Sequence, residues 1–212
     1  FLSRSLDIDD PMHGSKTGIR LFMAEYKRLA AECYIWGREY DKAAECFAYI
    51  ESVYSEIQIR DRYYVRYLYS LALYSICRHD VSHARELLGQ AEMLCRNNYD
   101  RATVLYYEAI INFVSADHLA GRKICSRIER SIDLFEEINS NIELTEARIL
   151  ASLMSGNNMS IVEFDPSNAA WFEYVFNYFE QLKEIVYEGK GTWKWRMDTD
   201  CEQKYLYVSV GK

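Results

Sequence analysis

Proline and glycine are scarce in this sequence, since its 212 residues include only two prolines and nine glycines. A sandwich or barrel of short strands needs frequent turns, and turns draw heavily on these two residue types. The chain also lacks any run of about 18 consecutive apolar residues, which a membrane-spanning helix requires. Half of the residues are hydrophobic and 27% are charged, as in ordinary folded proteins. The composition therefore predicts a helical protein with no membrane span.

Positive charge is in the minority. Lysine and arginine number 25 against 32 aspartate and glutamate residues, which gives a formal net charge of −7. A protein whose main ligand is nucleic acid usually carries an excess of positive charge. We therefore expect neither nucleic acid nor a membrane to be the partner.

The six cysteines include no C-x-x-C pair, and most lie inside apolar helical patterns. A free thiol in such a pattern behaves as a small buried hydrophobe. This usage predicts reduced, structural cysteines and a cytoplasmic location.

Motifs that carry catalysis are missing. The sequence has no glycine-rich phosphate loop, no G-x-S-x-G and no H-E-x-x-H. His79 and His83 have a spacing that would suit a metal on one helix face, but they straddle a turn in which Asp80 is expected to cap the next helix. We therefore expect no metal, no cofactor and no catalytic residues, and we expect that the chain is not an enzyme.

Two series of apolar positions recur at a nearly constant interval. The first series, spaced by 42, 40 and 39 residues, consists of Leu29-Ala30, Leu71-Ala72, Ile111-Asn112 and Leu150-Ala151. The second series is spaced by 41 and 40 residues and consists of the triplets Ala43/Phe47/Ile50, Ala84/Leu88/Ala91 and Ile124/Ile128/Ser131. Two interleaved series with one period predict a repeating pair of antiparallel helices. The predicted helices lie near 18–37, 40–58, 61–78, 80–96, 100–116, 119–139, 142–155 and 168–187.

One unit resembles a known family. Residues 29–37, LAAECYIWG, followed by residues 40–44, YDKAA, resemble the helix, glycine turn and second helix of the tetratricopeptide repeat family. The resemblance extends over roughly 20–187, with a period near 40 residues where the family has about 34. It also departs from the family in having Asn112 at a small-residue position and no proline closing a repeat. The resemblance implies an all-α fold, a right-handed superhelical array of antiparallel helix pairs.

The same resemblance implies that the first helix of each pair lines a concave groove. The inward-facing candidates that it assigns to peptide binding are Lys27, Tyr34, Arg66, Tyr69, Tyr106, Phe113 and Arg148. These cations set among aromatic rings would suit a protein or peptide segment that carries acidic groups or a C-terminal carboxylate. The alternative is that several of the tyrosines are core residues and that the cations are solvated surface.

The end of the chain has a different pattern. Residues 193–197 and 205–210 alternate aromatic or apolar with polar residues, which predicts a short β-hairpin. The helix expected over 168–187 should pack on the helix at 142–155 and close the array. The predicted organisation is an N-terminal extension at 1–17, a helical repeat domain at 18–187, and a hairpin tail or the start of a further domain at 188–212. The last helix and the hairpin are also candidates for forming a homo-oligomer or a larger complex.

A curved array of helix pairs offers a long surface for recognition and no deep pocket for chemistry. The sequence therefore predicts a protein-binding or peptide-binding scaffold or sensor module of a larger cytosolic signalling or regulatory system. The alternatives are the regulatory part of an enzyme whose catalytic part lies outside or after this chain, and a secretion-type chaperone.

Overall fold

The computed structural model of the chain describes residues 16–115, 121–155, 159–163, 177–178, 181, 192–198 and 205–211. Most of these residues are helical. The helices are α1 (Lys16–Trp36), α2 (Tyr40–Ile57), α3 (Arg62–Cys77), α4 (Val81–Leu94), α5 (Asn98–Ser115), α6 (Gly121–Glu137) and α7 (Asn141–Ser155). Each boundary lies within two residues of the helix predicted from the sequence, so the apolar periodicity located these seven helices correctly. None of the helices in the described ranges is both long enough and apolar enough to span a membrane.

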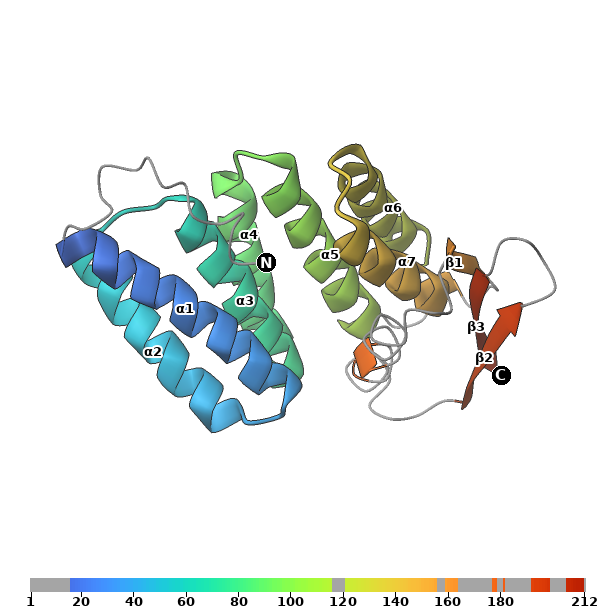
Figure 1. Ribbon diagram of the computed structural model, residues 1–212, viewed down its shortest axis with the longest axis horizontal. Helices are drawn as coiled ribbons and strands as arrows, with labels where there is room; N and C mark the ends of the chain where they lie inside the picture. The colour runs from blue at the N-terminus through green and yellow to red at the C-terminus, as the bar shows by residue number, and fades with distance from the viewer. Residues whose placement is uncertain are drawn as a thin grey trace.

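Consecutive helices pack as pairs, α1 with α2, α3 with α4 and α5 with α6 (Figure 1). The first helices of neighbouring pairs also touch: α1 contacts α3, α3 contacts α5, and α5 contacts α7. The first helices therefore lie next to one another in chain order, and each pair is in contact with the next.

The same short turn ends α1, α3 and α6. In each turn the second residue after the helix, Arg38, His79 or Asn139, has a positive φ of 54° to 61°. The residue after it donates its backbone N–H to a carbonyl five residues earlier, at 2.8 to 2.9 Å. This left-handed closure satisfies carbonyls at the helix end that would otherwise lack a partner. Arg38 and His79 are 41 residues apart, which gives the structural offset between the first two pairs.

Aspartate side chains start two of the helices. Asp61 accepts hydrogen bonds from the backbone N–H groups of Tyr63 and Tyr64 at 3.1 and 3.0 Å. Asp80 accepts one from His83 at 3.1 Å, so it is the helix cap that the sequence predicted.

The first two pairs meet through aromatic rings. Phe47 and Tyr54 on α2 face Tyr64, Tyr67 and Tyr74 on α3, with ring centroids 5.0 to 6.2 Å apart. Most of these contacts are edge-on or tilted, the arrangements that aromatic pairs favour. This interface joins the second helix of one pair to the first helix of the next.

In the described part of the chain after α7, three strands are present: β1 (Met159–Glu163), β2 (Thr192–Asp198) and β3 (Tyr205–Gly211). They form an antiparallel sheet in the order β1-β3-β2, and β1 and β3 contact α7. The sequence predicted strands at the positions of β2 and β3 and missed β1, whose partner lies more than forty residues further along the chain. The residues between β2 and β3 lie outside the described part of the chain.

Most of the helix expected over 168–187, and residues 1–15 of the expected N-terminal extension, also lie outside the described residues. Within 168–187 the structure describes Tyr178, which is buried and packs edge-on against Trp36 at the end of α1, with centroids 5.9 Å apart. The sequence placed this segment on α7, and apart from this contact of Tyr178 with α1 that prediction lies outside the described residues.

Candidate binding surface on the first helices

A buried arginine lies at the centre of α1. The stripe of α1 that faces the core consists of Leu21, Ala24, Arg28, Ala31 and Ile35, and Arg28 is only 6% exposed. Its Nε and Nη2 donate to the two oxygens of the Glu25 carboxylate at 2.8 and 2.9 Å. Its Nη1 donates to Glu32 at 2.6 Å and to the Ser70 hydroxyl of α3 at 3.0 Å. The guanidinium therefore connects Glu25, in the preceding turn of α1, and Glu32, in the following turn, to Ser70 on α3.

Arg28 stays charged in this setting. Burial alone would lower its pKa, but Glu32 and Glu25 act in the opposite direction, and the pKa stands well above its ordinary value. The Ser70 hydroxyl completes the arrangement by donating to Glu32 at 2.5 Å. A buried charge with this many hydrogen bonds fixes the position of the helices that supply them.

A second arginine, Arg66 on α3, lies between α1 and α5 with weaker contacts. Its Nη1 is 3.6 Å from Glu25, and its Nε is 3.8 Å from Oδ1 of Asp100 on α5. Both distances suit ion pairs and exceed that of a good hydrogen bond. Within the described residues, neither Arg66 Nε nor Asp100 Oδ1 has a hydrogen-bond partner. The rings of Tyr63 and Tyr99 lie 5.9 and 5.8 Å from the guanidinium carbon.

Asp100 belongs to the start of α5. Asn97 donates its side-chain amide to Oδ2 of Asp100 at 2.6 Å and accepts the Asp100 backbone N–H at 2.8 Å. Only 1% of Asp100 is exposed. Burial raises the pKa of its carboxyl above the ordinary value, although Asn97 and Arg66 counteract part of that effect.

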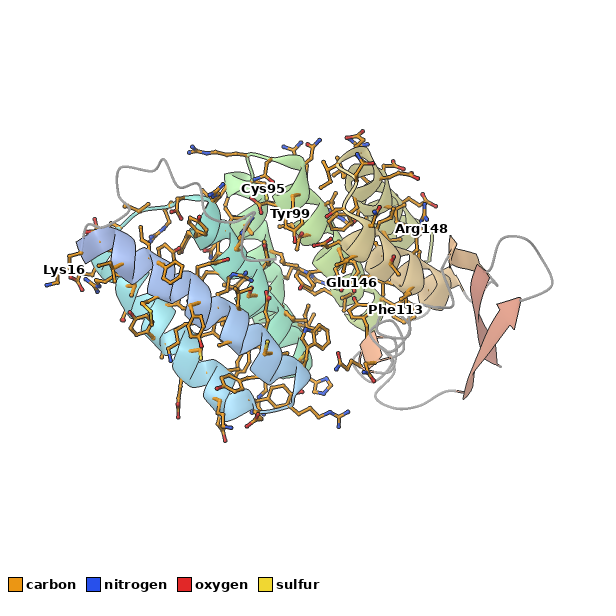
Figure 2. The ribbon with its side chains drawn as sticks, viewed as in Figure 1. Lys16, Cys95, Tyr99, Phe113, Glu146 and Arg148 are labelled. Atoms are coloured by element: carbon orange, nitrogen blue, oxygen red, sulfur yellow. The ribbon has the colours of Figure 1, made fainter. Side chains whose placement is uncertain are left out.

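The polar contacts continue to α7. The Tyr99 hydroxyl donates to Glu143 at 2.8 Å, and the Ser140 hydroxyl donates to the other oxygen of Glu143 at 2.8 Å. Figure 2 shows Tyr99 on α5 and Glu146 on the side of α7 that faces α5. The negative charge of Glu146 also acts on Tyr107, although burial is the main reason why the pKa of Tyr107 is raised.

These contacts define what we name the first-helix cluster, which extends over α1, α3, α5 and α7. Its members are Glu25, Arg28, Glu32, Arg66, Ser70, Tyr99, Asp100 and Glu143. Two guanidinium groups face four carboxylates, so the cluster carries an excess of negative charge. Three of these carboxylates, Glu25, Glu32 and Asp100, lie beside Arg28 or Arg66. The fourth, Glu143, accepts its hydrogen bonds from the neutral hydroxyls of Tyr99 and Ser140.

The seven candidates assigned from the family resemblance do not gather at one place. Arg66 is part of the cluster, and Tyr69 lies beside it with its ring 6.0 Å from that of Tyr107. Tyr106 is buried, with its hydroxyl lacking a hydrogen-bond partner among the described residues. Phe113 is half-buried and packs against the hydrophobic core.

The other three candidates face second helices. Tyr34 has the ammonium of Lys42 on α2 5.4 Å from its ring. Lys27 lies close enough to Cys46 of α2 for its charge to oppose the rise in pKa that burial imposes on that thiol. Arg148 donates to Glu136 of α6 at 3.2 Å, and Figure 2 shows it on the side of α7 away from Glu146. The expected set is therefore divided between the cluster, the core and the sides of the pairs.

The sequence-based candidates did not include Arg28 or its carboxylates. The signal was present, because Arg28 occupies a position in the apolar stripe of a helix, with Glu25 three residues before it and Glu32 four residues after it. Residues at these spacings share a helix face. An arginine inside an apolar stripe with an acid on each side indicates a buried, paired charge.

Among the described residues, no three His, Cys, Asp or Glu side chains are placed to hold a metal ion. His79 lies in the turn after α3 with a positive φ, and His83 lies in the first turn of α4. Comparison of the chain with protein-family models, with curated proteins and with solved structures gives no match.

Proposed function

We propose that this chain is a protein-binding module that recognises a peptide or protein segment along the first-helix cluster. The observation that carries the proposal is the continuous line of charged, hydroxyl and aromatic side chains over four neighbouring helices. Its partly exposed members, Glu25, Glu32, Arg66, Tyr99 and Glu143, offer hydrogen-bonding groups and a ring to an extended partner. The buried members Arg28, Ser70 and Asp100 hold the helices that carry them.

The charges favour a basic partner. Arg28, Arg66 and Arg148 all have carboxylates beside them, so their positive charge is already engaged within the chain. Glu143 can accept further hydrogen bonds, since each carboxylate oxygen has two lone pairs. An arginine or lysine of a partner would supply charge-assisted donors there, whereas the acidic partner expected from the sequence would meet an excess of like charge.

The arrangement of the pairs supports the finer assignment, a right-handed superhelical array of the tetratricopeptide type. The first helices touch in chain order, and the turns after α1 and α3 have the same backbone form. In such arrays the first helices line the concave side. Within this assignment the chain is the sensor or scaffold portion of a larger cytosolic signalling system.

The contacts of β1 and β3 with α7 favour this assignment over the start of a separate catalytic domain, because the sheet packs on the helices. A regulatory part of an enzyme and a secretion-type chaperone are the alternatives to the sensor assignment.

The test uses random peptides displayed on phage and selected on the immobilised chain. We expect the selected peptides to be rich in arginine or lysine, and one of them should bind with an affinity that falls as the salt concentration rises. Glu143→Gln, which removes one charge and keeps the acceptor for Tyr99, should weaken binding of that peptide about tenfold in calorimetry.

Glu136→Gln is the matched control, since it removes a carboxylate charge from the exposed side of α6. It should leave the affinity unchanged. Selection of acidic peptides, or equal loss of affinity in the two variants, would refute the assignment of the cluster as a surface for basic partners.

A further inference from the structure

The outer side of α1 is apolar and exposed. We name this side the α1 stripe. Its members are adjacent or lie three or four residues apart along the helix: Ile19, Phe22, Met23, Tyr26, Leu29, Ala30 and Cys33. The five large hydrophobic residues among them are 36% to 59% exposed. An apolar face of a helix is normally covered by another element. The five large side chains of the α1 stripe are therefore left largely uncovered by the described residues, while Ala30 also packs against the hydrophobic core.

Charged residues of α1 lie on either side of the stripe. Glu25, Arg28 and Glu32 interact with one another and with α3. Arg20 is paired through both of its terminal nitrogens with Glu56 of α2. Lys27, seven residues after Arg20, lies on the same side of the helix. No charge interrupts the stripe over the four turns between Ile19 and Cys33.

The second pair shows what such a stripe does. With the offset of 41 residues between the turns at Arg38 and His79, the residues of α3 equivalent to Met23, Tyr26 and Cys33 are Tyr64, Tyr67 and Tyr74. These are the tyrosines through which α3 packs on α2. The α1 stripe is thus the equivalent of a helix-packing face and is suited to another helix.

The positions in the stripe are symmetric about Tyr26. Ile19 and Cys33 are seven residues from it, Phe22 and Ala30 are four, and Met23 and Leu29 are three. If two copies of α1 pack antiparallel about a two-fold axis at Tyr26, each of these residues lies opposite an apolar residue of the other copy. Large side chains then face smaller ones in two of the three pairs, as close helix packing requires.

We propose that a second copy of this chain covers the α1 stripe, with the two α1 helices antiparallel and a two-fold axis at Tyr26. The absence of charge on the stripe means that the symmetry brings no like charges face to face. The acids beside the stripe, Glu25 and Glu32, are held by Arg28 and so do not oppose the approach of the same residues from the other copy.

The first test is the mass of the full chain in sedimentation equilibrium at micromolar concentration. We expect a dimer that Tyr26→Glu converts to a monomer, because the substitution places two carboxylates at the axis. Tyr26 is 59% exposed, so the thermal midpoint of the diluted variant should stay within a few degrees of that of the parent. Met93→Glu, on α4 at a residue 81% exposed, is the matched control and should leave the dimer intact.

A monomeric parent chain would overturn the proposal and would assign the stripe to a helix of another protein or to another segment of this chain. A dimer that persists in Tyr26→Glu would overturn it as well, because the contact would then lie elsewhere.

The second test reads the orientation. Ile19→Cys should form a disulfide with Cys33 of the other copy under mild oxidation, since the geometry places these two positions opposite each other. In the parent chain the two copies of Cys33 are about 20 Å apart along the helices, too far to bond. The crosslinked dimer should therefore appear in the variant, be absent from the parent, and be lost when Cys33→Ser is added. A dimer crosslinked through any other cysteine, or no crosslink, would overturn the antiparallel arrangement.

Discussion

Helices α1 and α3 occupy the same place in consecutive pairs and differ in how fully they are enclosed. Of the 16 residues of α3, nine are buried. Of the 21 residues of α1, five are buried, and all five lie on one stripe. Helix α3 has α2 on one side and α4 and α5 on the other, whereas α1 contacts α2 and α3. Position in the array, more than apolar content, decides which of these helices is enclosed.

The comparison also separates two kinds of buried charge. Arg28 on α1 has hydrogen bonds from every nitrogen to a carboxylate or hydroxyl. Arg66 on α3 has ion pairs at 3.6 and 3.8 Å and two tyrosine rings nearby. The first arrangement ties α1 to α3 through hydrogen bonds, and the second leaves two buried atoms, Arg66 Nε and Asp100 Oδ1, without a hydrogen-bond partner among the described residues.

The largest expected difference in the free energy of unfolding is between variants of Tyr67 and Tyr26, which occupy equivalent positions 41 residues apart. Tyr67→Ala removes a ring that is 6% exposed and packs on Phe47 and Tyr54, so it should lower the free energy of unfolding by about 3 to 5 kcal/mol. Tyr26→Ala, at a residue 59% exposed, should cost less than about 1 kcal/mol in a dilute monomer. Urea unfolding of both variants, monitored by circular dichroism, measures the difference.

Similar losses in the two variants would mean that the surroundings of α1 and α3 do not differ as described. Tyr67→Phe is a useful control, because it keeps the ring contacts and removes only the hydroxyl.

Truncation of Arg28 and of Arg66 to alanine should lower the free energy of unfolding by clearly different amounts. Arg28→Ala leaves Glu25 and Glu32 without their shared cation, and breaking such a buried pair costs about 3 to 5 kcal/mol. Arg66→Ala should cost about 1 to 2 kcal/mol, because its ion pairs are longer and its side chain is 23% exposed. The free energies of unfolding at low and high salt provide the measurement, and a larger loss for Arg66→Ala would contradict the order inferred from the distances.

Beyond its contacts with α2 and α3, α1 packs on Tyr178 through Trp36. A double-mutant cycle with Trp36→Leu and Tyr178→Leu should give a coupling energy of about 1 kcal/mol, as expected for an edge-on aromatic pair. A coupling near zero would show that the chain around Tyr178 does not hold this position against α1 in solution.

The helices could be predicted from the sequence because their signals are local. Apolar residues at helical spacing, aspartate caps and short polar links all lie within a few residues of the structure that they specify. Strand β1 could not be found in the same way, because a run of five residues has no lasting period and its partner β3 is distant in the chain.

Which way each side chain faces was harder to predict than the helices themselves, because it depends on the rotation of each helix. A shift of one residue turns a side chain by about 100° around the helix axis. Lys27 was assigned to the groove and lies near α2, while its neighbour Arg28 faces α3. Three or four apolar residues at helical spacing identify the face of a helix that packs on another element. The residues next to that face can be assigned to the groove or to the partner helix only when the position of the partner helix is known.

The smallest effect is expected at Asp100, where the sign depends on pH. Burial raises the pKa of this carboxyl, so the folded state holds the proton more tightly than the unfolded state. Between the unfolded and folded pKa values the contribution of this group to stability therefore falls as pH rises, and at pH 7 the full cost of the buried charge applies. Asp100→Asn removes that cost and should raise the free energy of unfolding by up to about 1 kcal/mol at pH 7.

The gain should disappear below the ordinary pKa of aspartate, about 3.9, because the parent carboxyl is then protonated in both states. Urea titrations at pH 7 and pH 3.5 test both statements. The asparagine keeps an oxygen for the Asn97 amide, so the start of α5 remains capped. If Asp100→Asn instead destabilises the chain at pH 7, the attraction between Asp100 and Arg66 outweighs the cost of burial, and the contact at 3.8 Å stabilises the packing of α3 on α5.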